Sequence, residues 1–347
     1  MRIRKGVNGM AEYREAKKVS LFRILKREKS IRRVLLISWA SNKIWIVVRT
    51  FLLIGFSFVL LYPLLYIITV SIRESADLMD PLAFWVPRHI TATNIVDSFN
   101  AMKYPQAFMN TIILDVVSTL LQLFSCALVG YGFARFRFPL KNLVFGLVIF
   151  TIIVPPQLII IPQYINFRYF DIFGLGSVLG LFFGKSVTLN LLDTVFTFYV
   201  PAFFGFGIRS GLFIFIFRQF FRGMSKELQE SAYIDGCGQF KTFVRIMAPN
   251  AIPAFITVFL FSLIWYWNDY YYAAMFFDRI KTVSLALESL KQEFLIMAKF
   301  KNDFLDPYVL VTRLQAGCLL TIAPIFLLYL FLQKFFVESI ERTGIVG

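Results

Sequence analysis

The sequence predicts an all-α, polytopic membrane protein, and three observations support this fold class. Apolar residues make up 58% of the 347 residues and charged residues 16%, whereas a soluble domain is nearer half apolar and a quarter charged. The chain holds 42 Phe, more than one soluble core can bury. Six apolar stretches are each about long enough to cross the roughly 30 Å of hydrocarbon in a bilayer. This composition excludes a cytosolic enzyme, a disordered protein and a nucleic-acid binder of the ordinary type.

The first segment, residues 1–44, is a basic tail. It carries 13 Lys and Arg and 3 Asp and Glu, and so supplies +10 of the formal net charge of +15. Beside a membrane span, such a tail indicates orientation and contact with anionic lipid rather than a nucleic-acid partner. Residues 20–40 fit either a helix on the inner leaflet or a disordered tail. The segment is too polar for a cleaved signal peptide.

The membrane domain is predicted to occupy residues 45–337. Pro155-Pro156 is expected to break its third span. An additional apolar piece near 173–192 is predicted to be re-entrant or interfacial, because Gly184-Lys185-Ser186 interrupts it. The six predicted spans lie near 46–72, 111–134, 143–164, 194–217, 254–277 and 316–336.

The distribution of Lys and Arg predicts the orientation of these spans. The segments on the side of the termini hold 23 basic residues, and the three opposite loops hold 11. Because basic residues are retained on the cytoplasmic side, we expect both termini to be cytoplasmic. Residues 338–347 then form a cytoplasmic tail, and residues 218–253 form a cytoplasmic loop.

The loop 218–253 has the pattern of two short helices joined at a glycine. Ser225 can cap a helix that begins at Lys226, and Gly236 is a natural helix stop. Apolar residues then recur at helical spacing, and prolines close the segment before the next span; these residues are Phe240, Phe243, Ile246, Met247, Pro249 and Pro253. The pattern favours a compact shape that is presented to a cytoplasmic partner. The alternative is a solvated amphipathic loop with an ordinary glycine stop.

The same loop resembles the EAA loop of bacterial ATP-binding-cassette importer permeases. In that pattern an E-A-A triplet is followed three residues on by D-G and then by a spaced I-x-L-P. Ser231 replaces the first alanine of the triplet, and Ala248 stands where the pattern usually has Leu. The matching residues are Glu230, Ala232, Asp235, Gly236, Ile246 and Pro249.

Other motifs resemble sugar-importer permeases of the maltose-transporter second-permease type. The resemblance covers about residues 45–347. It is carried by the A-R-F-R-F-P turn at 134–139, by Pro155-Pro156-Gln157, by Trp267-Asn268-Asp269-Tyr270 and by the T-G-I-V-G ending at 343–347.

The resemblance implies a subunit of a larger importer in a bacterial cytoplasmic membrane. The implied partners are a second homologous permease subunit, two cytoplasmic ATP-binding subunits and an extracytoplasmic sugar-binding protein. ATP and Mg²⁺ would be bound by the ATPase partner, so no cofactor and no enzymatic activity are expected in this chain. The EAA loop would be the coupling helix, with Glu230 pairing with a basic group on the ATPase and Gly236 permitting the turn. Glu338, Glu341 and Arg342 would contact the ATPase dimer.

The fifth predicted span ends in a group suited to sugars. Sugars are bound by hydrogen bonds to their hydroxyls and by stacking on aromatic rings, and Trp267, Asn268, Asp269 and Tyr270 offer both. The alternative is an aromatic belt at the membrane interface with an Asn-Asp pair that packs helices. No metal site is expected, because the chain has a single His and three scattered Cys.

The residues alone leave three other functions to consider. The segment 180–186, G-L-F-F-G-K-S, lacks the G-x-x-x-x-G-K-S spacing of a phosphate-binding loop, so no ATPase of that type is predicted here. A stand-alone secondary transporter or channel is a second hypothesis, although few carboxylates lie in mid-span to couple an ion. An importer of the same architecture for phosphate, peptides or amino acids is a third.

Overall fold

The computed structural model describes residues 39, 43–80, 85–171, 174, 176, 178, 188–302 and 304–344, with side chains as far as Gln333. Within these ranges the chain is helical and contains no strand, in agreement with the predicted class. The chain divides at Tyr66 into two units, and each is described by itself. Nearly all of the basic tail 1–44, most of the predicted re-entrant piece including Gly184-Lys185-Ser186, and the side chains of the tail 338–347 lie outside the described residues.

One long helix, Lys43–Ser71, begins in the first unit and coincides with the first predicted span. It contains an apolar window of mean hydropathy 2.4, none of which is buried. Phe51 and Leu60 are each 78% exposed. A helix that is apolar on all sides and uncovered by its own chain requires lipid or another protein around it, as a membrane span does.

The described residues contain three to five candidate spans by length and composition. Three single helices qualify: Lys43–Ser71, α3 (Tyr104–Arg135) and the part of α15 (Pro307–Gly344) up to Gln333. Two bent helix pairs raise the number to five if each is one span. These pairs are α4 (Lys141–Ile153) with α5 (Pro156–Arg168), and the segment Gln239–Asn250 with α12 (Ile252–Trp267).

The third predicted span, 143–164, is two helices rather than one. The axes of α4 and α5 are bent by 102°, and Val154 and Pro155 between them have extended backbone with ψ of 121° and 136°. Proline disfavours helical backbone in the residue before it and has no N–H to donate. The break that Pro155-Pro156 predicted is therefore confirmed.

The span predicted near 194–217 is not one continuous helix. The segment forms α7 (Phe196–Phe203) and α8 (Ser210–Gly223), separated by residues 204–209. Gly205 has φ +76° and Arg209 has φ +60°. Glycine adopts this left-handed backbone freely, whereas a residue with a Cβ pays about 1–2 kcal/mol for it. The two glycines of Phe204-Gly205-Phe206-Gly207 were the sequence signal for this break.

The fifth predicted span, 254–277, ends ten residues early. Helix α12 stops at Trp267, and a separate helix α13 (Tyr271–Phe276) follows Asn268, Asp269 and Tyr270. The polar pair 268–269 supplies side chains that bond nearby backbone groups instead of continuing the helix.

Loops that sequence analysis left without structure contain further helices. The longest is α14 (Val283–Phe300), which begins where the Thr282 hydroxyl accepts a hydrogen bond from the backbone N–H of Leu285 at 3.3 Å. The helix α15 begins at Pro307 rather than near 316. The loop 73–110 contains the 3₁₀ turn η1 (Ser75–Leu78) and α2 (Thr93–Ala101).

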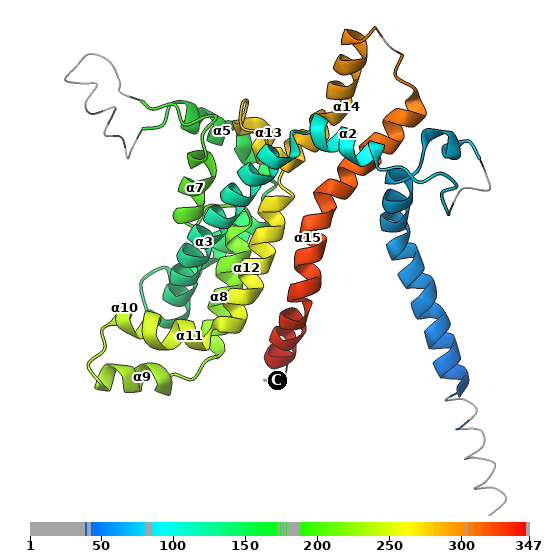
Figure 1. Cartoon of the computed structure of the whole chain (residues 1–347). Helices are drawn as coiled ribbons and strands as arrows, with labels where there is room; N and C mark the ends of the chain where they lie inside the picture. Colours follow the sequence, from blue (N-terminus) through cyan, green and yellow to red (C-terminus); the bar gives the residue numbers. More distant parts are fainter. Residues whose placement is uncertain are drawn as a thin grey trace, which may run out of the picture. The chain divides into compact units, whose positions relative to one another are not determined.

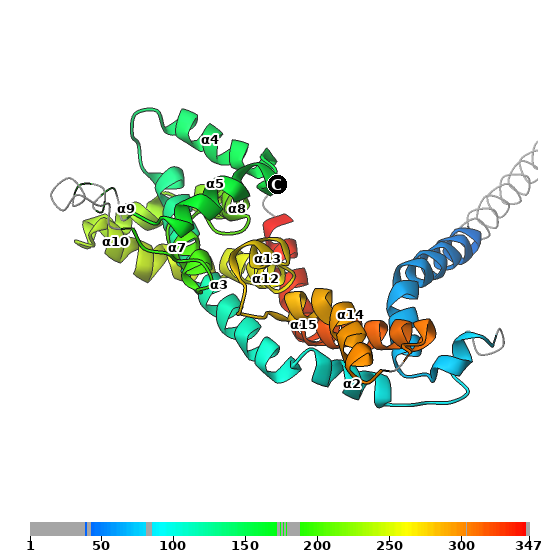
Figure 2. The same cartoon turned by 90° about the horizontal axis from the view of Figure 1, so that it is seen from above.

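Helix α3 is the centre of the second unit. It packs along α8, α12 and α7, as the two views at right angles show (Figures 1 and 2). Gly130 allows the closest approach: a Cβ at this position would lie 2.6 Å from the Phe217 Cβ and 3.0 Å from the Arg218 backbone nitrogen. The two helices are therefore in backbone contact at Gly130.

A polar network inside the bundle holds the α7–α8 break against α3 and α12. The buried Gln122 amide donates to the Ile208 carbonyl and to the Ser210 hydroxyl, each at 2.7 Å. Its side-chain oxygen accepts from the Ser262 hydroxyl at 3.0 Å. The Thr119 and Ser262 hydroxyls are 3.1 Å apart. Backbone groups freed by a broken helix need such partners where no bulk water reaches.

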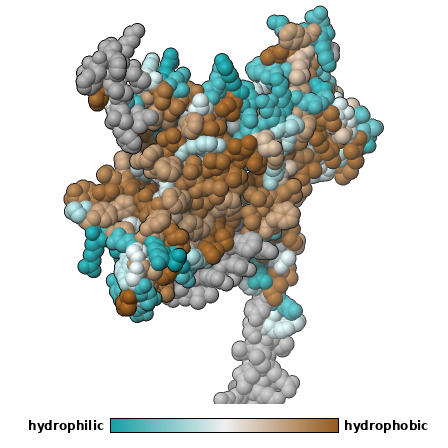
Figure 3. Space-filling view, turned by 60° about the vertical axis from the view of Figure 1, so that its left-hand side comes forward, coloured by the Kyte–Doolittle hydropathy of each residue, from teal (hydrophilic) through white to brown (hydrophobic). Residues whose placement is uncertain are grey.

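Apolar side chains cover the middle of the second unit. Figure 3 shows a brown apolar surface between teal hydrophilic patches, of which the lower lies over the loop 218–253. Below the surface, the phenylalanines of α8 form a fully buried row, Phe213, Phe217 and Phe221. A second buried cluster joins α5, α7 and α13, and a third joins α2, α14 and α15. An apolar belt between two polar ends is what a bilayer requires.

The single histidine, His89, closes the loop after the helix Lys43–Ser71 by hydrogen bonds to Asp77. His89 Nδ1 lies 2.9 Å from Asp77 Oδ1, and the backbone N–H groups of Arg88 and His89 each donate to Asp77 Oδ2 at 2.8 Å. The hydrogen bonds from the backbone and ring of His89 lower the pKa of Asp77. The same side-chain hydrogen bond, with the negative charge of Asp77, raises the pKa of His89.

We predict that Gly130→Ala destabilises the protein by separating α3 from α8. The new methyl group must displace backbone atoms of α8, and overpacking of this kind costs about 1–3 kcal/mol. Gly146→Ala in α4, where nothing lies within 4 Å of the added Cβ, is the control and should be neutral or slightly stabilising. Thermal unfolding in detergent measures both. Equal melting temperatures for the two variants would contradict the close contact.

The His89–Asp77 pair predicts a defined pH window for local stability. Because the pKa of His89 is raised, the His89–Asp77 pair stabilises the loop at low pH. This contribution is lost as the pH rises through the pKa of His89 in the folded state. The lowered pKa of Asp77 gives a contribution that is lost in acid. The pair should thus stabilise the loop most at pH values between the usual pKa values of Asp and His. NMR titration of the single His should give a midpoint above the usual value, which returns to it in Asp77→Asn.

Candidate functional site

The first arm of the loop 218–253 is the helix α9 (Glu227–Ile234). Residues 218–223 of the predicted loop still belong to α8. The Ser225 hydroxyl accepts a hydrogen bond from the Glu227 backbone N–H at 3.1 Å. The helix begins one residue later than predicted, so its N-cap is Lys226 rather than Ser225. Glu227 and Glu230 lie in its first turn, where carboxylates favour the positive end of the helix dipole.

The turn after α9 is closed by two backbone hydrogen bonds around Gly236. The Cys237 N–H donates to the Ala232 carbonyl at 2.9 Å, and the Gly236 N–H donates to the Tyr233 carbonyl at 3.1 Å. This pair of bonds is the Schellman arrangement, which requires left-handed backbone at the residue after the cap. Gly236 has φ +76°. The helix stop predicted at Gly236 is therefore present, and its part in coupling stays a prediction.

The second arm combines three short helical pieces. These are α10 (Gln239–Thr242), a π-helical turn η4 (Phe243–Met247) and α11 (Ala248–Asn250). Phe243 and Met247 are buried, whereas Phe240 is 62% exposed. The predicted apolar stripe is therefore split, because Phe240 points away from the bundle. The arm meets α12 at a bend of 80°.

Aromatic packing fixes the second arm to the ends of the long helices. Phe243 of η4 lies 5.1 Å from the ring of Tyr131 on α3 and 6.0 Å from the ring of Phe221 on α8. Tyr131 and Phe221 also pack against each other at 5.5 Å. Tilted and edge-on pairs of this kind contribute roughly 0.5–1.5 kcal/mol each beyond area burial. The loop is thus anchored to two helices of the bundle.

The A-R-F-R-F-P turn holds the other end of the loop. Arg135 Nη2 donates to the Met224 carbonyl at 2.7 Å and to the Ser225 carbonyl at 3.3 Å. Arg218 lies 3.8 Å from the ring centroid of Phe145 on α4. The start of α9 is therefore tied to the end of α3, and the two sequence motifs are neighbours in space.

The predicted coupling residues divide into buried and exposed positions. Ala232 is 1% exposed, so a larger side chain does not fit there. Ile246 is half-buried. The other four, Glu230, Asp235, Gly236 and Pro249, are exposed and available to a partner.

Sequence analysis missed the apolar part of this exposed surface. Ile234 is 86% exposed, and five further apolar side chains of the loop are between 39% and 62% exposed: Leu228, Tyr233, Phe240, Val244 and Ile252. The sequence signal was a surplus of apolar residues beyond those that one buried stripe can use. Exposed apolar side chains rimmed by charge indicate a protein interaction site; here the charges are Glu227, Glu230, Asp235, Lys241 and Arg245.

The predicted sugar-contact residues occupy four different environments. Trp267 is 3% exposed, and its indole N–H donates to the Thr321 carbonyl of α15 at 3.1 Å. The carboxylate of Asp269 accepts from the N–H groups of Tyr272 at 3.3 Å and Ala273 at 3.0 Å, and so caps α13. Asn268 is exposed but donates back to the Ile264 carbonyl at 2.9 Å, and Tyr270 is 43% exposed. Their assignment to a substrate path stays a prediction.

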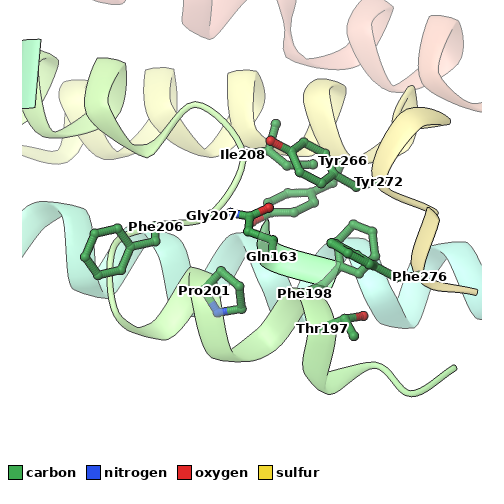
Figure 4. A pocket seen from close by; sticks show the side chains of 10 residues that line it. All are labelled: Gln163, Thr197, Phe198, Pro201, Phe206, Gly207, Ile208, Tyr266, Tyr272 and Phe276. Carbon is green, nitrogen blue, oxygen red and sulfur yellow. The ribbon is translucent and has the colours of Figure 1, made fainter. Parts of the chain in front are cut away.

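A small pocket lies beside the α7–α8 break. Figure 4 shows side chains from α5, α7 and the region around α12 and α13 that converge on Gly207 and Ile208. Its volume is about 20 Å³, enough for a water molecule and too little for a sugar ring. Among the described residues, no group of three or more His, Cys, Asp or Glu could hold a metal ion.

Comparisons with known proteins agree with the membrane architecture. Residues 127–342 match the model of the family described as binding-protein-dependent transport system inner membrane component. The chain is 26% identical to the arabinooligosaccharides transport system permease protein AraQ of Bacillus subtilis, over 84% of this chain and 92% of that protein. It is 27% identical to the melibiose/raffinose/stachyose import permease protein MelC of the same species, over 82% and 91%.

A solved structure has the same fold. It belongs to a bacterial ABC transporter involved in the import of the acidic polysaccharide alginate. The TM-score is 0.66 and the identity 23%, and the match covers 85% of this chain and 98% of that chain.

We predict that Gly236→Val loosens the end of α9, while Gly238→Val does not. Neither added Cβ meets an atom within 4 Å, so the two variants differ in backbone conformation: Gly236 has φ +76° and Gly238 has φ −69°. The strain at position 236 is about 1–2 kcal/mol. Hydrogen exchange of residues 227–237 should accelerate roughly tenfold in Gly236→Val only. Equal exchange in both variants would show that the turn does not depend on left-handed backbone.

Proposed function

We propose that this chain, which belongs to the family of binding-protein-dependent transport system inner membrane components, is the permease subunit of an ATP-driven importer. It forms half of the translocation path for a sugar or oligosaccharide. The sugar class is supported by the oligosaccharide importers among its relatives and by the A-R-F-R-F-P and W-N-D-Y motifs. A second homologous permease completes the path.

We further propose six spans with cytoplasmic termini in a bacterial cytoplasmic membrane. The three single spans and the bent pair of α4 and α5 supply four, α12 beyond the loop segment Gln239–Asn250 supplies the fifth, and α7 with α8 supplies the sixth as a broken span. The C-terminal end of α15 lies at the same end of the second unit as α9, α10 and α11 (Figure 1). This placement supports the loop 218–253 and the C-terminus on one side of the membrane.

The coupling role of the loop 218–253 rests on one observation. Two short helices locked by the Gly236 turn present exposed apolar and acidic side chains, while Phe243, Met247 and Arg135 fix the same loop to the spans. A partner that closes on this surface moves the attached helices, because the Arg135 hydrogen bonds and the packing of Phe243 tie the loop to α3 and α8. The proposed partner is a cytoplasmic ATPase dimer, which binds ATP and Mg²⁺. An extracytoplasmic binding protein would deliver the sugar to the opposite side.

The test uses Ile234→Asp, which places a charge at the most exposed apolar position of the loop. Because this side chain is 86% exposed, the variant should fold, and the buried interface that it disrupts should lose at least about tenfold in affinity. The matched control is Phe300→Asp at the end of α14, where Phe300 is also 86% exposed. Tagged chains are purified from the native membrane in detergent.

Wild type and Phe300→Asp should carry the second permease and the ATPase, and Ile234→Asp should lose the ATPase while keeping the permease. Glu230→Ala should likewise reduce the amount of ATPase that is recovered with the chain. Recovery of the wild-type chain alone, with transport intact after reconstitution, would overturn the proposal in favour of a self-contained transporter. Uptake restricted to phosphate, peptides or amino acids would overturn the sugar class alone.

A further inference from the structure

The structure places an arginine on an open face of the bundle at membrane depth. Arg209 ends the α7–α8 break and directly precedes α8, whose other end joins the coupling loop 218–253. Helix α8 has 14 residues, so Arg209 lies about 21 Å from that end at 1.5 Å per residue, within a hydrocarbon layer of roughly 30 Å. The residue is exposed. A charged side chain at this depth is expensive in lipid and faces a partner or a water-filled path instead.

The local geometry is built around this guanidinium. Arg209 Cζ lies 4.4 Å from the ring centroid of Trp265 on α12, so the guanidinium is held over the indole. The backbone at Arg209 has φ +60°, a strained conformation for a residue with a Cβ, and such strain concentrates at functional sites. The Gln122 amide holds the adjacent Ile208 carbonyl at 2.7 Å. The position of the side chain is therefore fixed from both sides.

The surface around Arg209 carries groups that can bind a polar ligand. Along α12 the exposed positions are Phe261 and Trp265, at 37% and 39%. Exposed aromatic rings beside a guanidinium provide stacking and hydrogen bonds for a sugar. Arg, Trp and Phe are also enriched at the centres of protein interfaces, so the binding experiment also measures subunit content.

The charge of the site selects among sugars. Within the described part of the chain, the ion pairs join other arginines, such as Arg313 to Asp97 at 2.6 Å, and none places a carboxylate within 4 Å of Arg209. A guanidinium binds a carboxylate by two parallel charge-assisted hydrogen bonds, which neutral hydroxyls cannot match. Resting on the proposed function as a sugar permease, we infer that Arg209, held by Trp265, is a binding site in the path for the carboxylate of an acidic sugar.

The experiment measures equilibrium binding to the complete importer without its binding protein. The probe is labelled digalacturonate, and the comparison ligand is its methyl ester, which keeps the rings and removes the charge. The variants are Arg209→Gln and Arg209→Lys. The matched control is Arg168→Gln, since Arg168 is also exposed and lies 5.7 Å from an aromatic ring, that of Tyr169.

Wild type should bind the free acid at least about tenfold more tightly than the ester, and added salt should reduce this preference. Arg209→Gln should lose the preference and bind the ester as wild type does, Arg209→Lys should keep part of it, and Arg168→Gln should be unchanged. Absence of a preference in wild type, or equal weakening of both ligands in Arg209→Gln, would overturn the inference. Loss of the second permease from Arg209→Gln would also overturn it and assign Arg209 to the subunit interface.

ATP hydrolysis and subunit content are measured on the same preparations. If no ATPase accompanies the wild-type chain, the proposed function fails. If the importer assembles and hydrolyses ATP but shows no preference for the acid, only the present inference fails.

Discussion

The hydrogen bonds of Gln122 are the constraint on which the rest of the bundle depends. The α7–α8 break leaves backbone groups without helical partners in a region that a bilayer surrounds, where each unsatisfied group costs several kcal/mol. The Gln122 side chain accepts a hydrogen bond from the Ser262 hydroxyl on α12 and donates to the Ile208 carbonyl and the Ser210 hydroxyl at the break. One side chain of α3 therefore permits the break and joins three helices.

Two consequences follow from a fixed break. Toward the loop, α8 is a straight helix whose buried row of phenylalanines packs on α3, where Gly130 brings the two backbones together. Away from the loop, the break turns Arg209 out of the core and over Trp265. Residues 204–209 thus separate α8, which packs on α3 through its buried phenylalanines, from the end of the bundle that carries the exposed charge of Arg209.

The sequence predicted the features that arise from local chemistry. Composition gave the membrane class, Pro155-Pro156 gave the kink, and Gly236 gave the turn, because proline and glycine act on their own backbone. The α7–α8 break was not predicted: Gly205 and Gly207 were a local signal for it, but the tertiary hydrogen bonds of Gln122 that stabilise it cannot be read from an apolar run. The exposed Ile234 and the helix α14 were missed for the same reason. Which apolar residues are buried depends on partners distant in the chain, and Trp267, expected at the path, is buried against α15.

The connectivity suggests how the two ends of the bundle communicate. The loop 218–253 joins α8 to α12 through a turn and an aromatic anchor. At the ends of these two helices that lie away from the loop, Arg209 directly precedes α8 and Trp265 lies two residues before the end of α12. A displacement of the loop that tilts α8 against α12 therefore changes the separation of Arg209 and Trp265 directly. Because Trp265 holds the guanidinium that we infer binds a carboxylate, such a displacement also changes the geometry of that binding site, which is a physical requirement for coupling.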